Sequence, residues 1–285
     1  MKVGLIALGA LVPLVAQAAP PVPPDDEYVA WRCGDGSHMT DAQADDPDFL
    51  GDLDVVGGDT APAALRAADE EFLYLRIRLD DDPAPGQVPN PGGVWGVAFD
   101  LDGNLADYEV LIVVDATRAT PAVAVHTNAT VTVPNSPLDP ADAPPAMTYA
   151  FADAVASRAT STTTGGTPDY FIDIVMPWED LEPLGLTPDS IVRVWVASSS
   201  VADALDGDFA CHASGSGQVV LDDSASRNDP SDPDGGSGDG PRLEGGGGCA
   251  AAGGGGAVLA GLLLFALALA RSRDRSSNAA SRSSV

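Results

Sequence analysis

The sequence predicts an all-β protein, an antiparallel β-sandwich, over residues 28–222. Short runs rich in β-branched and aromatic residues are separated by Gly, Pro and Asp, and helical periodicity is nearly absent from the same stretch. The clearest run alternates between aliphatic and other side chains at every position. Several short strands with turn signals between them are typical of two packed antiparallel sheets.

The first 18 residues have the pattern of a secretory signal peptide. Lys2 precedes an apolar run at 3–15, and Ala16-Gln17-Ala18 offers a small-residue cleavage site after Ala18. Residues 19–27 then form a Pro-rich, acidic spacer. We therefore expect the part of the chain that follows to be exported.

The strand signal is strongest at 72–79, where every second side chain is aliphatic: Leu73, Leu75, Ile77 and Leu79. Further strands are predicted at 94–99, 108–114, 122–126, 129–133, 170–176, 191–197 and 218–221. The one helix candidate is 177–184, because Pro177 suits a first turn and Gly185 suits the residue after the last turn.

Charge limits the partners of this protein. Residues 19–248 contain nine arginines, no lysine and 41 acidic residues, which gives a formal charge of −32. Nucleic acid is excluded as a partner, since phosphate contacts need a basic surface. Repulsion among so many carboxylates can be offset by cations, which leaves open calcium bound at specific carboxylates or a saline habitat. Residues 223–248, rich in Asp, Gly, Ser and Pro, are predicted to be a disordered acidic linker.

Cys33 and Cys211 lie near the two ends of the predicted domain. Two such cysteines in an exported protein are expected to form a disulfide bond. The bond would bring the ends of the domain together, which fits a sandwich whose first and last strands are neighbours.

The region 249–285 carries a second targeting pattern. A Gly-rich lead ends at Cys249, and a short apolar run at 257–270 precedes Arg271, Arg273 and Arg275. This order resembles the three-part C-terminal sorting tail of myxobacterial surface proteins. The resemblance implies processing and anchoring at Cys249 and a location at the cell surface or outer membrane of a Gram-negative bacterium, or release after the tail is processed. The alternative is an ordinary single-pass hydrophobic helix with an incidental cysteine.

Four segments follow one another in an order that resembles that of a known family. They read GDLD at 51–54, AADEEFLYLRI at 67–77, WGVAFDLDGN at 95–104 with DYE at 107–109, and DYFIDI at 169–174 with MPW at 176–178. This succession resembles the jelly-roll domains related to family 9 carbohydrate-binding modules, over residues 49–211. The resemblance implies a jelly-roll-like sandwich and an extracellular glycan as partner.

The candidate metal ligands are Asp100, Asp102, Asn104 and Asp107. They place oxygen atoms at alternate positions of one turn, as a hard cation such as calcium requires, although the spacing departs from an EF-hand loop. The alternative is a plain β-turn in which Gly103 supplies the positive φ. The acidic residues at 206–208 and at 80–82 are open to the same two interpretations.

Trp95 and Trp195 are the candidate ligand-binding residues, because sugar-binding domains stack pyranose rings on exposed indoles. The alternative is that both fill the core. In the strand at 191–197, Val192, Val194 and Val196 lie on one face and Trp195 lies on the other. We expect the valine face to be the buried one.

No set of catalytic residues is apparent in the sequence. The histidines, His38, His126 and His212, lie in no zinc-binding spacing, and no serine lies in a nucleophile-elbow pattern. We expect an exported, surface-anchored, non-catalytic module that binds carbohydrate and holds structural calcium, and that meets the membrane through its C-terminal tail. The alternative is a structural or adhesive component that contacts the envelope or matrix and has no small-molecule ligand.

Overall fold

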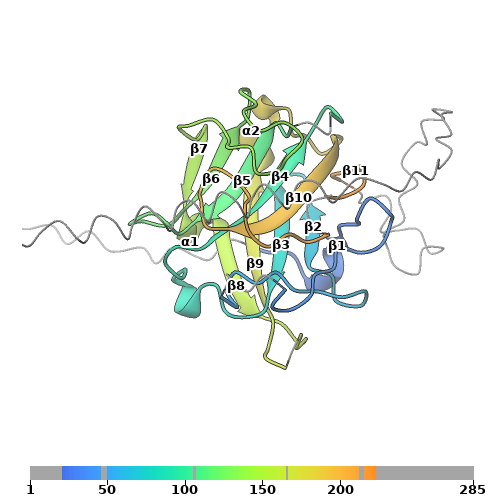
Figure 1. Cartoon of the computed structure of the whole chain (residues 1–285), viewed down its shortest axis with the longest axis vertical. Coiled ribbons are helices and arrows are strands. Elements are labelled where there is room, and N and C mark those ends of the chain that lie inside the picture. Colours follow the sequence, from blue (N-terminus) through green and yellow to red (C-terminus); the bar gives the residue numbers. More distant parts are fainter. Residues whose placement is uncertain (1–20, 46–49, 105–106, 165, 212–214, 223–285) are drawn as a thin grey trace, which may run out of the picture. The chain divides into compact units, whose positions relative to one another are not determined.

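The computed structural model describes residues 21–45, 50–104, 107–164, 166–211 and 215–222, which form two packed antiparallel sheets (Figure 1). In strand order, the first sheet comprises β1 (Val29–Ala30), β2 (Ala64–Ala68), β3 (Phe72–Leu79), β9 (Tyr170–Pro177) and β8 (Val155–Ala159). The second comprises β11 (Val219–Val220), β10 (Ile191–Ser199), β4 (Val94–Asp100), β5 (Val110–Asp115), β6 (Ala122–Thr127) and β7 (Met147–Ala150). This arrangement confirms the predicted antiparallel sandwich.

Short helical turns connect some of the strands: η1 (Asp25–Glu27), η2 (Pro85–Gln87), α1 (Phe151–Ala154), α2 (Trp178–Leu181) and η3 (Glu182–Leu184). None of the helices in the described ranges has the length and apolar character needed to cross a membrane. The expected signal peptide, acidic linker and sorting tail with Cys249 lie outside the described residues.

The main core lies between the two sheets and follows the alternation of the strands. In β3 the aliphatic side chains at every second position are fully buried in this core. In β10 the inward residues are Val192, Val194 and Val196, so the prediction about the valine face is confirmed. Each such side chain contributes about 1.5–3 kcal/mol by leaving water, which makes this core the main stabilising element of the sandwich.

One predicted strand is wrong. Residues 129–133 form no strand, because three of their backbone N–H groups donate to the side chains of Asp142 and Asp139 instead of a neighbouring strand. The Asp139 carboxylate, 0% exposed, accepts hydrogen bonds from the backbone N–H groups of Thr132 (2.8 Å) and Val133 (2.5 Å). The edge of β6 that this segment could have paired with is occupied by β7.

The predicted helix at 177–184 is found as α2 followed directly by η3. Pro177 precedes the first turn with an extended backbone, and Gly185 ends the last turn with φ of 91°. The short strands β1, β2, β7 and β8 were not predicted.

An ionic network covers the outer face of the first sheet. The Arg76 guanidinium donates to Asp173 (2.5 Å) and to Asp25 (2.7 Å), and the Arg76 and Asp173 side chains are 1% and 0% exposed. The same guanidinium stacks 3.5 Å from the Tyr28 ring and 4.4 Å from the Phe171 ring. Asp25, the first residue of η1, and Tyr28, the residue after it, are thereby held against β3 and β9.

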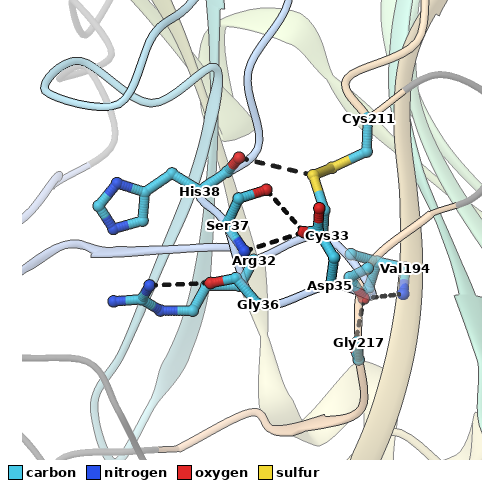
Figure 2. Close-up of a disulfide and its surroundings, with 10 residues drawn as sticks. Arg32, Cys33, Asp35, Gly36, Ser37, His38, Val194, Cys211 and Gly217 are labelled. Carbon is cyan, nitrogen blue, oxygen red and sulfur yellow. Dashed lines mark hydrogen bonds between the residues drawn. A yellow bond between two sulfur atoms is a disulfide. The ribbon is translucent and has the colours of Figure 1, made fainter.

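The predicted disulfide joins Cys33 to Cys211, with their Cα atoms 5.8 Å apart and a sequence separation of 178 residues. Figure 2 shows the tight turn at Cys33, where Gly36 N donates to the Cys33 carbonyl (2.9 Å) and Cys33 N to the Ser37 carbonyl (2.8 Å). Cys211 N donates to the Thr40 carbonyl (3.2 Å). The two ends of the domain therefore meet, as predicted, although β1 and β11 belong to different sheets.

Candidate metal centre

The turn that leaves β4 gathers acidic side chains. Asp100, Asp102 and Glu109 each offer one carboxylate oxygen, and these three oxygens lie within 4.8 Å of one another. Asp100 is the last residue of β4, and Glu109 is the residue before β5. The β4–β5 hairpin brings them together, because Glu109 N donates to the Phe99 carbonyl (2.9 Å) at the end of the ladder.

Backbone N–H groups fix one oxygen of each carboxylate. Asp100 Oδ1 accepts from Gly103 N (2.7 Å), Asp102 Oδ1 accepts from Asn104 N (2.7 Å), and Glu109 Oε2 accepts from Leu101 N (2.6 Å). Gly103 has a φ of 76°, a left-handed conformation that favours glycine. Gly103 thus supplies the positive φ that a turn requires here, and the turn also orients its carboxylates.

One oxygen of this group has no donor. Asp100 is 1% exposed, and its Oδ2 atom is buried without any hydrogen-bond partner. Asp107, further along the turn, likewise has a buried Oδ1 without a partner. An ionised oxygen in this position costs several kcal/mol unless a proton or a cation accompanies it.

Burial and mutual repulsion disfavour the ionised state of these carboxyls. Burial raises the pKa of Asp100, against the opposing effects of the Gly103 N–H and the Arg193 charge. Burial also raises the pKa of Glu109, and the neighbouring charges of Asp102 and Asp100 raise it further. Arg193 is the backbone partner of Asp100 across β10 and β4, and its charge is the one that favours ionisation of Asp100 beside the other two carboxylates.

The predicted ligands are only partly brought together. Asp100 and Asp102 belong to the group, whereas Asp107 does not. Asn104 contributes its backbone N–H to the Asp102 carboxylate. Glu109 was missed as a ligand, although the hairpin geometry implied by strands on both sides of the turn would have placed it beside Asp100.

Oxygen ligands of this kind suit a hard cation. Calcium takes six to eight oxygens from carboxylates, backbone carbonyls and water, whereas structural zinc prefers His and Cys. The group consists of three carboxylates and includes neither His nor Cys. The donor set therefore suits a hard cation such as calcium better than zinc.

The candidate sugar platforms lie in the interior. Trp95 is 0% exposed, packs in the main core and donates its indole N–H to the Asp52 carbonyl (2.7 Å). Trp195 is 5% exposed and packs on the outer face of the second sheet among residues that include Leu111 and Leu205. Neither indole presents an open ring face, so the prediction that they stack on a sugar does not fit their placement.

Comparison with protein-family models, curated proteins and solved structures gave no match to this chain.

Proposed function

We propose that this chain is an exported, non-catalytic β-sandwich module of the bacterial cell envelope, which binds calcium at Asp100, Asp102 and Glu109. It is held at the cell surface through its C-terminal tail, with Cys249 as the processed residue. The observation that carries the calcium proposal is the buried Asp100 Oδ2 atom, which lacks a donor and lies in a group of three carboxylates. Calcium would neutralise this group and fix the β4–β5 turn.

A structural or adhesive role is favoured over sugar stacking. Among the described residues, every aromatic side chain is buried or half-buried, and the exposed large apolar side chains are aliphatic. A pyranose ring therefore finds no exposed aromatic face in this part of the chain. Sugar binding of the kind that the resemblance to jelly-roll carbohydrate-binding modules implies would therefore depend on polar groups in the loops. An acidic module could instead contact envelope or matrix components through shared cations.

Calcium-dependent association tests this proposal. Light scattering of the purified chain should show larger assemblies in calcium than in EDTA, and the Asp100→Asn/Glu109→Gln variant should lose most of the difference. The matched control is Asp153→Asn/Glu182→Gln, which removes two exposed charges far along the chain from the turn. Equal scattering in calcium and EDTA for the unmodified chain would count against the adhesive role.

Two further measurements separate the location and the ligand. Cell fractionation should recover the protein with the envelope, and Cys249→Ala should reduce its retention there. A glycan array read with and without EDTA should give no calcium-dependent signal. Strong binding to one glycan class would instead favour the carbohydrate-binding alternative.

A further inference from the structure

A second group of carboxylates lies near the disulfide, away from the β4–β5 turn in sequence. Asp41, Asp45 and Asp208 each offer one oxygen, and these three oxygens lie within 4.8 Å of one another. Asp41 and Asp208 are 7% and 5% exposed, while Asp45 is exposed to solvent. The group therefore has a buried floor and an open side through which an ion can enter.

Backbone contacts hold the three segments that meet here. Asp41 N donates to the Gly57 carbonyl (3.1 Å), and Gly57 N returns a bond to the Asp41 carbonyl (3.0 Å). The Asp208 Oδ2 atom accepts from Val55 N (2.6 Å). Asp41 and Asp208 thus reach the same place from opposite ends of the domain, in a fixed geometry.

Two oxygens at this place are buried without a donor. Asp41 Oδ1 accepts from Ala42 N (3.0 Å), whereas Asp41 Oδ2 has no partner. Asp54, 4% exposed, accepts from Ala44 N (2.9 Å) through Oδ2, and its Oδ1 atom has no partner. The donorless Asp41 oxygen belongs to a residue of the three-carboxylate group, where a shared proton or a positively charged ligand would neutralise it.

We infer that Asp41, Asp45 and Asp208 form a second divalent-cation site, with Asp54 beside it, and that calcium is the ion it takes. In the described part of the chain, no arginine forms an ion pair with any of these four residues. A single shared proton would neutralise only one of the charges. A divalent cation can contact several carboxylates at once, and calcium tolerates the irregular geometry that two separate segments provide.

The electrostatics of this group agree with the assignment. Burial, followed by the charge of Asp208, raises the pKa of Asp41 to about 9. Burial also raises the pKa of Asp208 to about 7. Without a cation these carboxylates oppose one another's ionisation in the folded chain.

The site would reinforce the same junction that the disulfide closes. Cys211 N donates to the Thr40 carbonyl (3.2 Å), one residue before Asp41, and Asp208 is three residues before Cys211. A bound ion would join the segment at 41–45 to the loop before Cys211 without a covalent bond. The bound ion would act as a second cross-link, beside the disulfide, between segments near the two ends of the domain.

Calcium counting on the purified full chain tests the inference. Calorimetric titration should find about two ions on the unmodified chain and on the Asp153→Asn/Glu182→Gln control, and one fewer on Asp41→Asn/Asp208→Asn. The same count for the Asp41→Asn/Asp208→Asn variant as for the control would overturn the inference. The asparagine variant should fold in EDTA, because it removes like charges and keeps the side-chain volume.

Two additional variants keep the result interpretable. Asp45→Asn changes only an exposed side chain, so it should leave folding intact and weaken one of the two binding events at least about tenfold; unchanged affinity would also contradict the inference. Asp100→Asn/Glu109→Gln should remove the other ion. If that variant keeps every ion while Asp41→Asn/Asp208→Asn loses one, the proposed β4–β5 centre fails and the second site stands.

Discussion

Replacing Cys33 and Cys211 by alanine removes the constraint that ties the two ends of the domain. The bond spans 178 positions, and in the chain-entropy model a closed loop of this length lowers the free energy of the folded state relative to the unfolded state by about 5 kcal/mol. A domain of ordinary stability has about 5–15 kcal/mol in total. The variant is therefore expected to lose a third or more of its free energy of unfolding.

Urea unfolding at 25 °C, followed by tryptophan fluorescence in the presence of EDTA, measures this loss. The midpoint should fall, and the slope of free energy against urea should rise because the unlinked unfolded chain exposes more surface. A reductant should lower the midpoint of the unmodified protein and leave the alanine variant unchanged. Cys249→Ala is the matched control and should match the unmodified chain. Equal midpoints for the oxidised protein and the alanine variant would refute the reasoning.

Three further changes test the scaffold. Asp173→Asn leaves the buried Arg76 guanidinium with only Asp25, its more exposed partner, so urea unfolding should show a loss of about 3–5 kcal/mol in the free energy of unfolding. The double variant R76M/D173L removes both buried charges and should lose less. A larger loss for the double variant would contradict the pairing. Gly96→Ala puts a Cβ 2.6 Å from a side chain of β5 and should cost about 1–3 kcal/mol in thermal melts, whereas Gly34→Ala, with open space around it, should change stability by less than about 0.5 kcal/mol. Partial burial opposes ionisation of Asp25, but hydrogen bonds from Arg158 and Arg76 outweigh it and hold the pKa of Asp25 below the ordinary 3.8. The ionised Asp25 therefore stabilises the folded chain above that pH, and this stabilisation is lost as the pH falls through the folded-state pKa. The stability curves of the unmodified chain and Asp25→Asn should therefore converge at acid pH, and a constant gap would contradict the ion pair.

Most of the longer strands could be predicted from β-prone runs in the sequence, whereas most of the short strands could not. The strand at 72–79 was found with its bounds because local pattern and burial agree there. The Ala-rich strand β2 has little β-propensity of its own and is a strand because β3 pairs with it. The failure at 129–133 has a cause just outside the segment, since Asp139, six residues after Val133, accepts from backbone donors that the alternating pattern assigns to a neighbouring strand.

The candidate site divides in the same way. Asp100 and Asp102 could be predicted as ligands from the sequence because both lie within one turn. The position of Glu109 beside them depends on the pairing of β4 with β5. Asp41 and Asp208 meet only in the folded chain, so no local spacing announces them. The direction of Trp95 likewise depends on the register of β4, which buries its indole.

Anomalous diffraction from crystals grown in millimolar calcium tests the calcium proposal most directly. The account predicts a peak about 2.3–2.6 Å from carboxylate oxygens of Asp100, Asp102 and Glu109. Crystals of Asp100→Asn/Glu109→Gln should lack that peak while keeping the rest of the sandwich unchanged. A well-ordered β4–β5 turn with no ion beside these carboxylates would contradict the account.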